Sequence, residues 1–202
     1  MTASIICLGD SITYGYPVGP DFSWVEHLQQ RTKINLLNFG VNGSTSQDML
    51  SRYRRYSQAA NVAHVHILGG GNDALQQLTW GETRRNMQNL LELIRQRDTT
   101  PILGLLTPIC HDPGGGGEFV PAPALAFLAK WKVRYRDWLR DYASRESILL
   151  IDYFTPFCLP GTDEGDGQYF YDESHLNENG QALLADVAEY TWLKTLSTSV
   201  PV

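Results

Sequence analysis

The sequence predicts an α/β fold in which one parallel sheet lies between two layers of helices. The first apolar run, residues 4–8, has no polar alternation, which is typical of a strand buried on both faces. Strand-like runs then alternate with helix-like segments along the whole chain. This order implies right-handed crossovers, and therefore parallel strands with helices on both faces of the sheet.

The expected strands are short apolar runs, and the expected helices carry apolar residues at helical spacing. After the first strand, a short helix is expected at 21–28, and further strands at 34–38, 62–68, 102–106 and 148–151. Three helices are expected between the later strands, marked by Met49, Leu50 and Tyr53, by Met87, Leu90, Leu91 and Ile94, and by the stretch 125–142. A last helix is expected to carry Leu183, Leu184 and Val187.

Two helix starts have recognisable caps. Thr79 with Glu82 three residues later forms a capping-box pattern, which satisfies free amides at a helix start. Asn177 is expected to cap the final helix. Two connections, 108–121 with its glycine run at 114–117 and 153–171, are longer than usual, which makes them candidates either for function or for plain surface loops.

Length and composition indicate a globular protein that does not bind nucleic acid. The 202 residues are expected to form one domain, 1–202, and the net charge of −6 argues against nucleic acid or an anionic membrane as partner. Three cysteines show no Cys-x-x-Cys spacing, and Cys7 is expected in the core. No signal peptide or membrane-spanning run is visible, so a cytoplasmic location is expected.

Ser11 is the candidate nucleophile. It follows the first predicted strand within the stretch Gly9-Asp10-Ser11-Ile12-Thr13. In open α/β sheets the ligand crevice lies outside the carboxyl ends of the strands, so Ser11 is expected in that crevice. A serine hydroxyl needs a neighbouring base to become a good nucleophile.

His175 is the best candidate for that base. It lies in Asp172-Glu173-Ser174-His175, between the last strand and the last helix. A carboxylate three residues before a histidine can accept its far N–H, which orients the ring and stabilises the imidazolium. Of the 5 histidines, His27 is expected on a surface helix, and His111 in a loop. His64 and His66 share a strand face and are read as buried, hydrogen-bonded histidines in preference to a metal pair.

Three groups are candidates for an oxyanion site, which must offer hydrogen-bond donors to the charge that develops on the carbonyl oxygen. They are the backbone amides of Ser11 and Gly43 and the side-chain amide of Asn72, each after a different predicted strand. At any one of these positions, a turn residue is an equally good explanation.

Together, these residues resemble the motifs of the SGNH (GDSL-type) hydrolase family. The four matching blocks are Gly9-Asp10-Ser11-Ile12-Thr13, Gly43, Gly70-Gly71-Asn72-Asp73 and Asp172-Glu173-Ser174-His175. The resemblance implies a flavodoxin-like three-layer fold with strand order 2-1-3-4-5. It also implies Ser11 as nucleophile, His175 as base oriented by Asp172, and Gly43 and Asn72 as oxyanion donors. Ile12-Thr13 replaces the leucine of the family name, and Gly69 adds one glycine to the third-strand turn.

The expected activity is therefore hydrolysis of an ester by a serine enzyme. The expected substrate is a small-molecule ester with a small or medium acyl group, and neither a metal nor an organic cofactor is expected. Two alternatives remain open: acyl transfer by the same residues, and a catalytically silent binding module on this fold. The sequence does not predict the acyl length, the alcohol or the oligomeric state.

Overall fold

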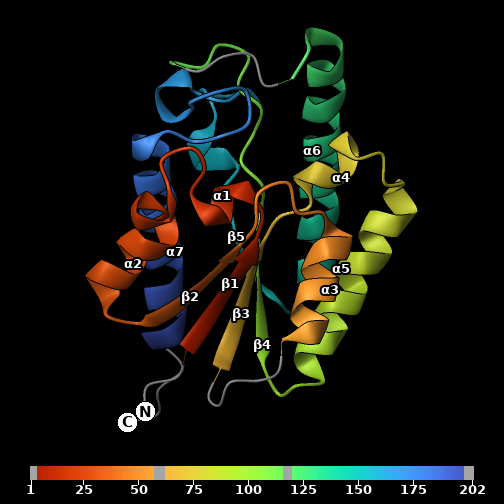
Figure 1. The fold of residues 1–202 in the computed structure, drawn as a ribbon, viewed down its shortest axis with the longest axis vertical. Coiled ribbons are helices and arrows are strands. Elements are labelled where there is room, and N and C mark those ends of the chain that lie inside the picture. Colours follow the sequence, from red (N-terminus) through yellow and green to blue (C-terminus); the bar gives the residue numbers. More distant parts are fainter. Residues whose placement is uncertain (1–3, 57–61, 116–119, 198–202) are drawn as a thin grey trace.

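A computed structural model describes residues 4–56, 62–115 and 120–197. Its centre is a parallel sheet with the strand order β2-β1-β3-β4-β5, as expected (Figure 1). The strands are β1 (Ser4–Gly9), β2 (Asn35–Gly40), β3 (Val62–Leu68), β4 (Thr100–Gly104) and β5 (Leu149–Ile151). The predicted three-layer α/β fold is confirmed.

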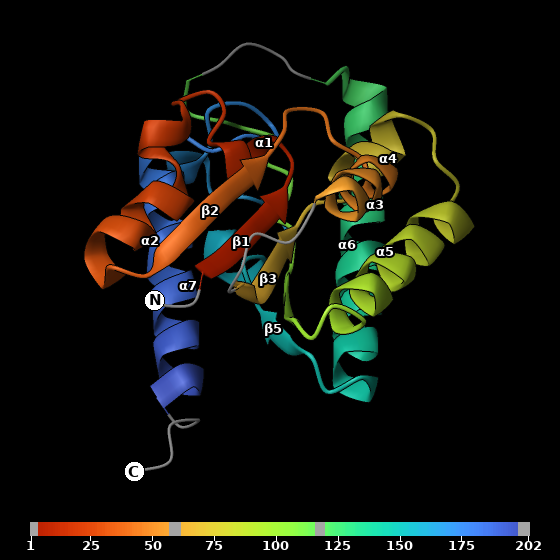
Figure 2. The ribbon, with the colours of Figure 1, turned by 60° about the horizontal axis from the view of Figure 1, so that its bottom comes forward.

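Helices cover both faces of this sheet (Figures 1 and 2). One layer contains α2 (Trp24–Thr32) and α7 (Glu178–Ser197), and the other contains α3 (Ser46–Arg55), α5 (Trp80–Arg95) and α6 (Ala122–Arg145). The short helices α1 (Ser11–Tyr14) and α4 (Gly71–Leu75) follow β1 and β3 directly. Single turns of 3-10 helix lie at Pro20–Phe22, Thr155–Phe157 and Gly167–Tyr169.

Most predicted elements are present, with shifted ends. The expected helix 21–28 is divided, because Ser23 adopts extended backbone angles and caps α2 by accepting from the Glu26 amide at 3.3 Å. The fourth strand begins at Thr100 and ends at Gly104, two residues before the expected range. Pro101 is tolerated there because it lies at the start of the strand, where a missing N–H matters least.

Both predicted helix caps are confirmed. Thr79 and Glu82 form a reciprocal capping box at the start of α5. The Asn177 side chain accepts a hydrogen bond from the Gly180 amide at 3.0 Å, in the first turn of α7. The apolar stripe of α5 is buried against the sheet, as its helical spacing predicted; it consists of Met87, Leu90, Leu91 and Ile94.

The chain turns sharply where β1 ends, and glycine permits the turn. A Cβ atom on Gly9 would lie 2.1 Å from Thr13 Oγ1 and 2.3 Å from the Leu68 carbonyl oxygen, so no larger residue fits. Helix α1 can therefore fold back directly over the strand end, and it brings Ser11 to the carboxyl edge of the sheet. In the described part of the chain, no helix is sufficiently long and apolar to cross a membrane.

Candidate active site

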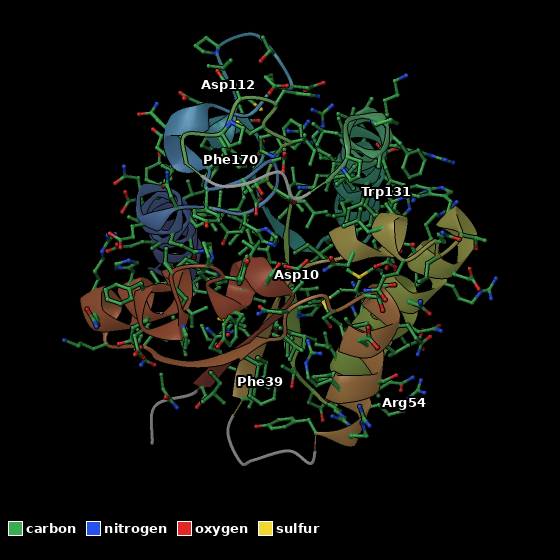
Figure 3. The ribbon with its side chains drawn as sticks, turned by 45° about the horizontal axis from the view of Figure 1, so that its top comes forward. Asp10, Phe39, Arg54, Asp112, Trp131 and Phe170 are labelled. Carbon is green, nitrogen blue, oxygen red and sulfur yellow. The ribbon has the colours of Figure 1, made fainter. Side chains whose placement is uncertain are left out.

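Ser11 is the first residue of α1, directly beyond the end of β1. Asp10 caps this short helix, since its Oδ1 accepts a hydrogen bond from the Ile12 amide at 3.0 Å. Figure 3 looks toward the carboxyl edge of the sheet and shows Asp10 near the middle of the view, with the α6 helix of Trp131 on one side and the segment of Phe170 on the other. Ser11 is therefore held at the centre of that edge by its own helix cap.

The Asp172–His175 turn brings an imidazole to Ser11. His175 Nε2 lies 3.1 Å from Ser11 Oγ, and its Nδ1 lies 2.8 Å from Asp172 Oδ2. Asp172 Oδ1 also accepts the backbone amides of Ser174 and His175, at 2.9 and 2.7 Å. With the Nδ1 proton on the Asp172 side, the Nε2 lone pair faces the serine hydroxyl.

Two buried carboxylates next to Ser11 have opposite pKa shifts. Burial raises the pKa of Asp10 to about 6, although the Ile12 amide and the charges of Lys132 and His175 act against this. Burial also tends to raise the pKa of Asp172, but the hydrogen bond and charge of His175 outweigh it, and the pKa falls below its usual value. Asp172 is therefore the carboxylate that stays ionised beside the imidazole.

Gly43 and Asn72 lie on the open side of Ser11. Together with Ser11, His175 and Tyr16, they line a cavity of about 160 Å³. Gly43 has a φ of +72°, a conformation that glycine adopts at no steric cost. Asn72 Nδ2 donates to the Ser44 carbonyl oxygen at 3.1 Å, which fixes the orientation of the amide. The structure therefore brings all five predicted site residues to one place.

Asp73 and Ser46 support this arrangement, and of these two only Asp73 belongs to one of the matching motifs. Asp73 is fully buried, and its carboxylate accepts hydrogen bonds from the Ser46 amide at 2.8 Å and from the Ser46 hydroxyl. Asn86 donates to the same hydroxyl at 3.1 Å. This network joins α3, α4 and α5 behind Asn72. The sequence signal for Asp73 was its place next to Asn72 in the motif. Ser46 lies outside all four motifs, so no signal in the sequence pointed to it.

Lys132 is another residue that the sequence analysis did not place in the site. It lies in α6, is 5% exposed, and lines a small cavity of about 30 Å³ that also borders Ser11 and His175. Its signal was present: position 132 is one turn after Leu128 and three residues before Tyr135, both in the apolar stripe of the helix. A lysine in such a stripe is unusual because a buried ammonium costs free energy.

His66 and His111 have other partners, whereas His64 is only half-buried and not fully buried as expected. His66 is fully buried, its Nε2 lies 3.2 Å from the Tyr153 hydroxyl, and burial lowers its pKa to about 3. His111 pairs with Glu164 and joins the two long connections to each other. Residues 116–119, which include the second half of the glycine run 114–117, lie outside the described residues. Within the described residues, no group of three His, Cys, Asp or Glu side chains is placed to hold a metal ion.

Tyr16 forms one wall of the open cavity. Its ring meets the His175 ring edge-on, with the two centroids 4.7 Å apart, and it remains 39% exposed. The exposed edge of the ring is available to whatever enters the cavity from solvent. Tyr16 was not among the residues predicted from the sequence.

Comparison with known proteins assigns the family. The model of the GDSL-like lipase/acylhydrolase family matches residues 7–183. The chain is 27% identical to the uncharacterized lipoprotein YqeF of Bacillus subtilis (strain 168), over 84% of this chain and 76% of that protein. It is 26% identical to thioesterase 1/protease 1/lysophospholipase L1 of Escherichia coli (strain K12), over 50% of this chain and 49% of that protein.

Comparison with solved structures points to the same family. A member of the lipolytic protein G-D-S-L family from Veillonella parvula DSM 2008 superposes with a TM-score of 0.72 and 25% identity, covering 94% of this chain and 97% of that one. The family match spans every predicted site residue from Ser11 to His175. The chain belongs to the GDSL-like lipase/acylhydrolase family, and it is a serine hydrolase that acts on ester bonds.

Proposed function

We propose that this enzyme hydrolyses esters of small or medium acyl groups through an acyl-enzyme on Ser11. The observation that carries the proposal is the chain of contacts from Ser11 Oγ to His175 Nε2, 3.1 Å, and from His175 Nδ1 to Asp172 Oδ2, 2.8 Å. These distances are within the range in which a base can accept the proton of a nucleophile.

In the first half of the reaction, Ser11 Oγ attacks the ester carbonyl carbon while His175 Nε2 takes the hydroxyl proton. The Asp172 carboxylate accepts the Nδ1–H and stabilises the imidazolium that forms. The tetrahedral intermediate then breaks its bond to the alcohol oxygen, and His175 gives the proton to this leaving oxygen. The acyl group remains on Ser11.

In the second half, a water molecule replaces the alcohol. His175 removes a proton from the water as it attacks the acyl carbonyl, and the proton returns to Ser11 Oγ when the acid is released. Our scheme assigns no role to a metal or an organic cofactor.

The oxyanion donors in this scheme are the Ser11 amide, the Gly43 amide and Asn72 Nδ2. They come from the ends of three adjacent strands, β1, β2 and β3. Support comes from the fixed orientation of Asn72 and from the shared cavity of about 160 Å³ next to Ser11. Donors held in place before the reaction stabilise the developing charge without reorganisation.

The substrate class is an ester of a small molecule, with an acetylated sugar or a lysophospholipid as candidates. The Escherichia coli relative is named a thioesterase and lysophospholipase, which supports cleavage of an acyl group. A panel of 4-nitrophenyl esters from acetate to palmitate, followed by natural esters of the preferred length, tests the acyl range. A fluorophosphonate probe that labels Ser11 separates an enzyme from a silent binding module.

Acyl transfer to an alcohol or sugar remains the alternative use of the same residues. Adding such acceptors to an ester assay and looking for the transesterified product separates the two activities. A cytoplasmic location also remains a proposal, and the Bacillus subtilis relative is named a lipoprotein. Fractionation of the native cells, with detection of the protein in each fraction, tests the location.

A further inference from the structure

Two cavities of different character border Ser11 and His175. The larger, about 160 Å³, contains Tyr16 and Gly43, and the exposed Tyr16 connects it to solvent. The lining of the smaller, about 30 Å³, includes the buried residues Leu106, Thr107, Leu128 and Lys132, together with Leu75, which is 37% exposed. After the first half of the reaction, the alcohol must leave while the acyl group stays on Ser11. The larger and more open cavity therefore suits the alcohol, and the smaller and more deeply buried one suits the acyl group.

The acyl cavity is small. Room for one water molecule requires roughly 10–15 Å³ on the same measure, so the cavity of about 30 Å³ accepts a group of only a few heavy atoms. Leu106 and Leu128 line it with apolar surface, and Lys132 adds a charged group. An acyl group in this cavity must lie against the lysine.

Lys132 reaches the cavity from α6 and is held in place by two acceptors. Its Nζ lies 3.2 Å from Ser174 Oγ and 3.5 Å from the Pro108 carbonyl oxygen. Its Cε lies 3.8 Å from the position of a Cβ atom on Gly71, the residue before Asn72. The ammonium is therefore placed between the Asp172–His175 turn and the turn that carries Asn72.

An ammonium has three N–H donors. In the part of the chain that the structure describes, Nζ has two acceptors, Ser174 Oγ and the Pro108 carbonyl oxygen, which leaves one donor for the cavity. Among the residues that the structure describes, no carboxylate comes within 4.0 Å of Nζ. Burial lowers the pKa of Lys132 to about 8, so the group is still largely protonated at neutral pH. A purely alkyl acyl group would leave this donor buried without an acceptor, which costs free energy.

We propose that Lys132 makes the smaller cavity selective for a short acyl group that carries a neutral oxygen close to the ester carbonyl, as an alkoxyacetyl or hydroxyacetyl group does. This inference rests on the proposed function, since it assigns the acyl side of the same reaction. A neutral oxygen is favoured over a carboxylate because Asp10 and Asp172 already supply negative charge to Lys132. Lys132 thus acts as a specificity-determining residue.

The test compares two esters of nearly equal size, 4-nitrophenyl butyrate and 4-nitrophenyl methoxyacetate, which differ by the replacement of one methylene with oxygen. Each kcat/KM is divided by the rate constant of the same ester with hydroxide, because the oxygen makes the carbonyl more reactive. We expect the wild-type enzyme to favour the methoxyacetate by about 10- to 100-fold after this correction, the usual effect of one hydrogen bond to a charged group.

The variants locate the cause of the preference. Lys132→Met should bring the corrected ratio close to one, whereas Lys132→Arg, which keeps a charged donor, should retain part of the preference. Leu128→Met is the matched control, because Leu128 lines the same cavity one helical turn away and has no donor; its ratio should equal that of the wild type.

Three results would overturn the proposal. The first is a corrected wild-type ratio near one, which is measured without any variant. The second is a corrected ratio in Lys132→Met that equals the wild-type ratio. The third is a corrected ratio in Leu128→Met that falls as far as the ratio in Lys132→Met. If the fluorophosphonate probe labels Ser11 and both esters are hydrolysed, any of these results leaves the proposed function intact. A protein that hydrolyses neither ester and does not react with the probe would overturn both proposals.

Discussion

The Asn72 side chain is anchored to the Ser44 carbonyl oxygen by a hydrogen bond of 3.1 Å from its Nδ2. One of the two N–H groups of the amide is used in this bond, and the other remains for a ligand. Since Ser44 follows Gly43 directly, the same contact joins the two turns that carry the proposed oxyanion donors. The orientation of Asn72 is thus built into the fold before any substrate binds.

Asn72→Ala should lower kcat by roughly 10²- to 10³-fold and change KM little, because one of the proposed oxyanion donors is lost. Steady-state kinetics on one soluble ester measures both constants. Asn89→Ala, which removes an exposed amide from α5, is the control and should behave as wild type. An unchanged kcat with a raised KM would instead make Asn72 a substrate-binding residue.

Ser11→Ala should abolish turnover and labelling by the fluorophosphonate probe, because the hydroxyl is the group that the acyl chain would bond to. The fold should persist, with the free energy of unfolding within about 1 kcal/mol of wild type, since the hydroxyl contributes one hydrogen bond at most. Denaturant unfolding and the ester assay are measured on the same preparation. Substantial residual esterase activity would exclude Ser11 as the nucleophile.

Asp172→Asn should lower kcat by up to about 10⁴-fold. Asp172 Oδ1 accepts the amides of Ser174 and His175, so the asparagine oxygen must take this position. Its NH₂ group then takes the position of Oδ2, the oxygen nearer to His175 Nδ1, which favours the ring proton on Nε2 and so the loss of the acceptor for the Ser11 proton. Asp112→Asn is the control for the loss of one negative charge, because Asp112 is an exposed residue at the same edge of the sheet. A near-normal rate in Asp172→Asn would remove Asp172 from its proposed role.

Ser46→Ala should destabilise the protein by about 1–3 kcal/mol, the cost of leaving a buried charged group without one of its partners. The change removes the hydroxyl that donates to Asp73 and accepts from Asn86. Denaturant unfolding measures the effect, and Ser51→Ala in the same helix is the control. Equal stability of Ser46→Ala and wild type would show that the Asp73 network does not hold α3 and α4 together.

The fold and the proposed triad could be predicted because their signals are local. Buried parallel strands appear as apolar runs, and Asp172 and His175 meet within a single turn. Helix ends were less predictable, because a single capping residue can decide where a helix begins. Ser23 caps α2 and so divides the expected helix 21–28. The position of Lys132 in the apolar stripe of its helix indicates that it is buried, but only the packing of α6 against the strand ends places it beside Ser11.

The same limit applies to the network behind Asn72. Ser46 and Asp73 are 27 residues apart, and only the packing of α3 against α4 brings them together. No spacing rule connects a serine in one helix to an aspartate in another. The motif predicted which residues gather at the strand ends, whereas the supports of those residues depend on tertiary contacts. The assignments of Ser11, Asp172, His175, Gly43 and Asn72 to their roles stay predictions.

The last prediction concerns Lys132 and pH. Burial lowers its pKa from 10.5 to about 8 in the folded protein, so between these values the unfolded chain binds more protons than the folded one. Stability attributable to Lys132 must therefore rise with pH across this window. The penalty for the buried charge is fully present below pH 8 and is relieved by about 3 kcal/mol toward pH 10.5.

Lys132→Met removes this titration, so the comparison with wild type isolates it from other groups that ionise at high pH. The free energy of unfolding of wild type minus that of Lys132→Met should be constant near pH 7 and increase by about 3 kcal/mol by pH 10.5. Denaturant unfolding at several pH values measures the difference. Leu128→Met, in the same cavity, should show a flat difference throughout. If the difference for Lys132→Met is equally flat, Lys132 is not held as a buried ammonium beside Ser11.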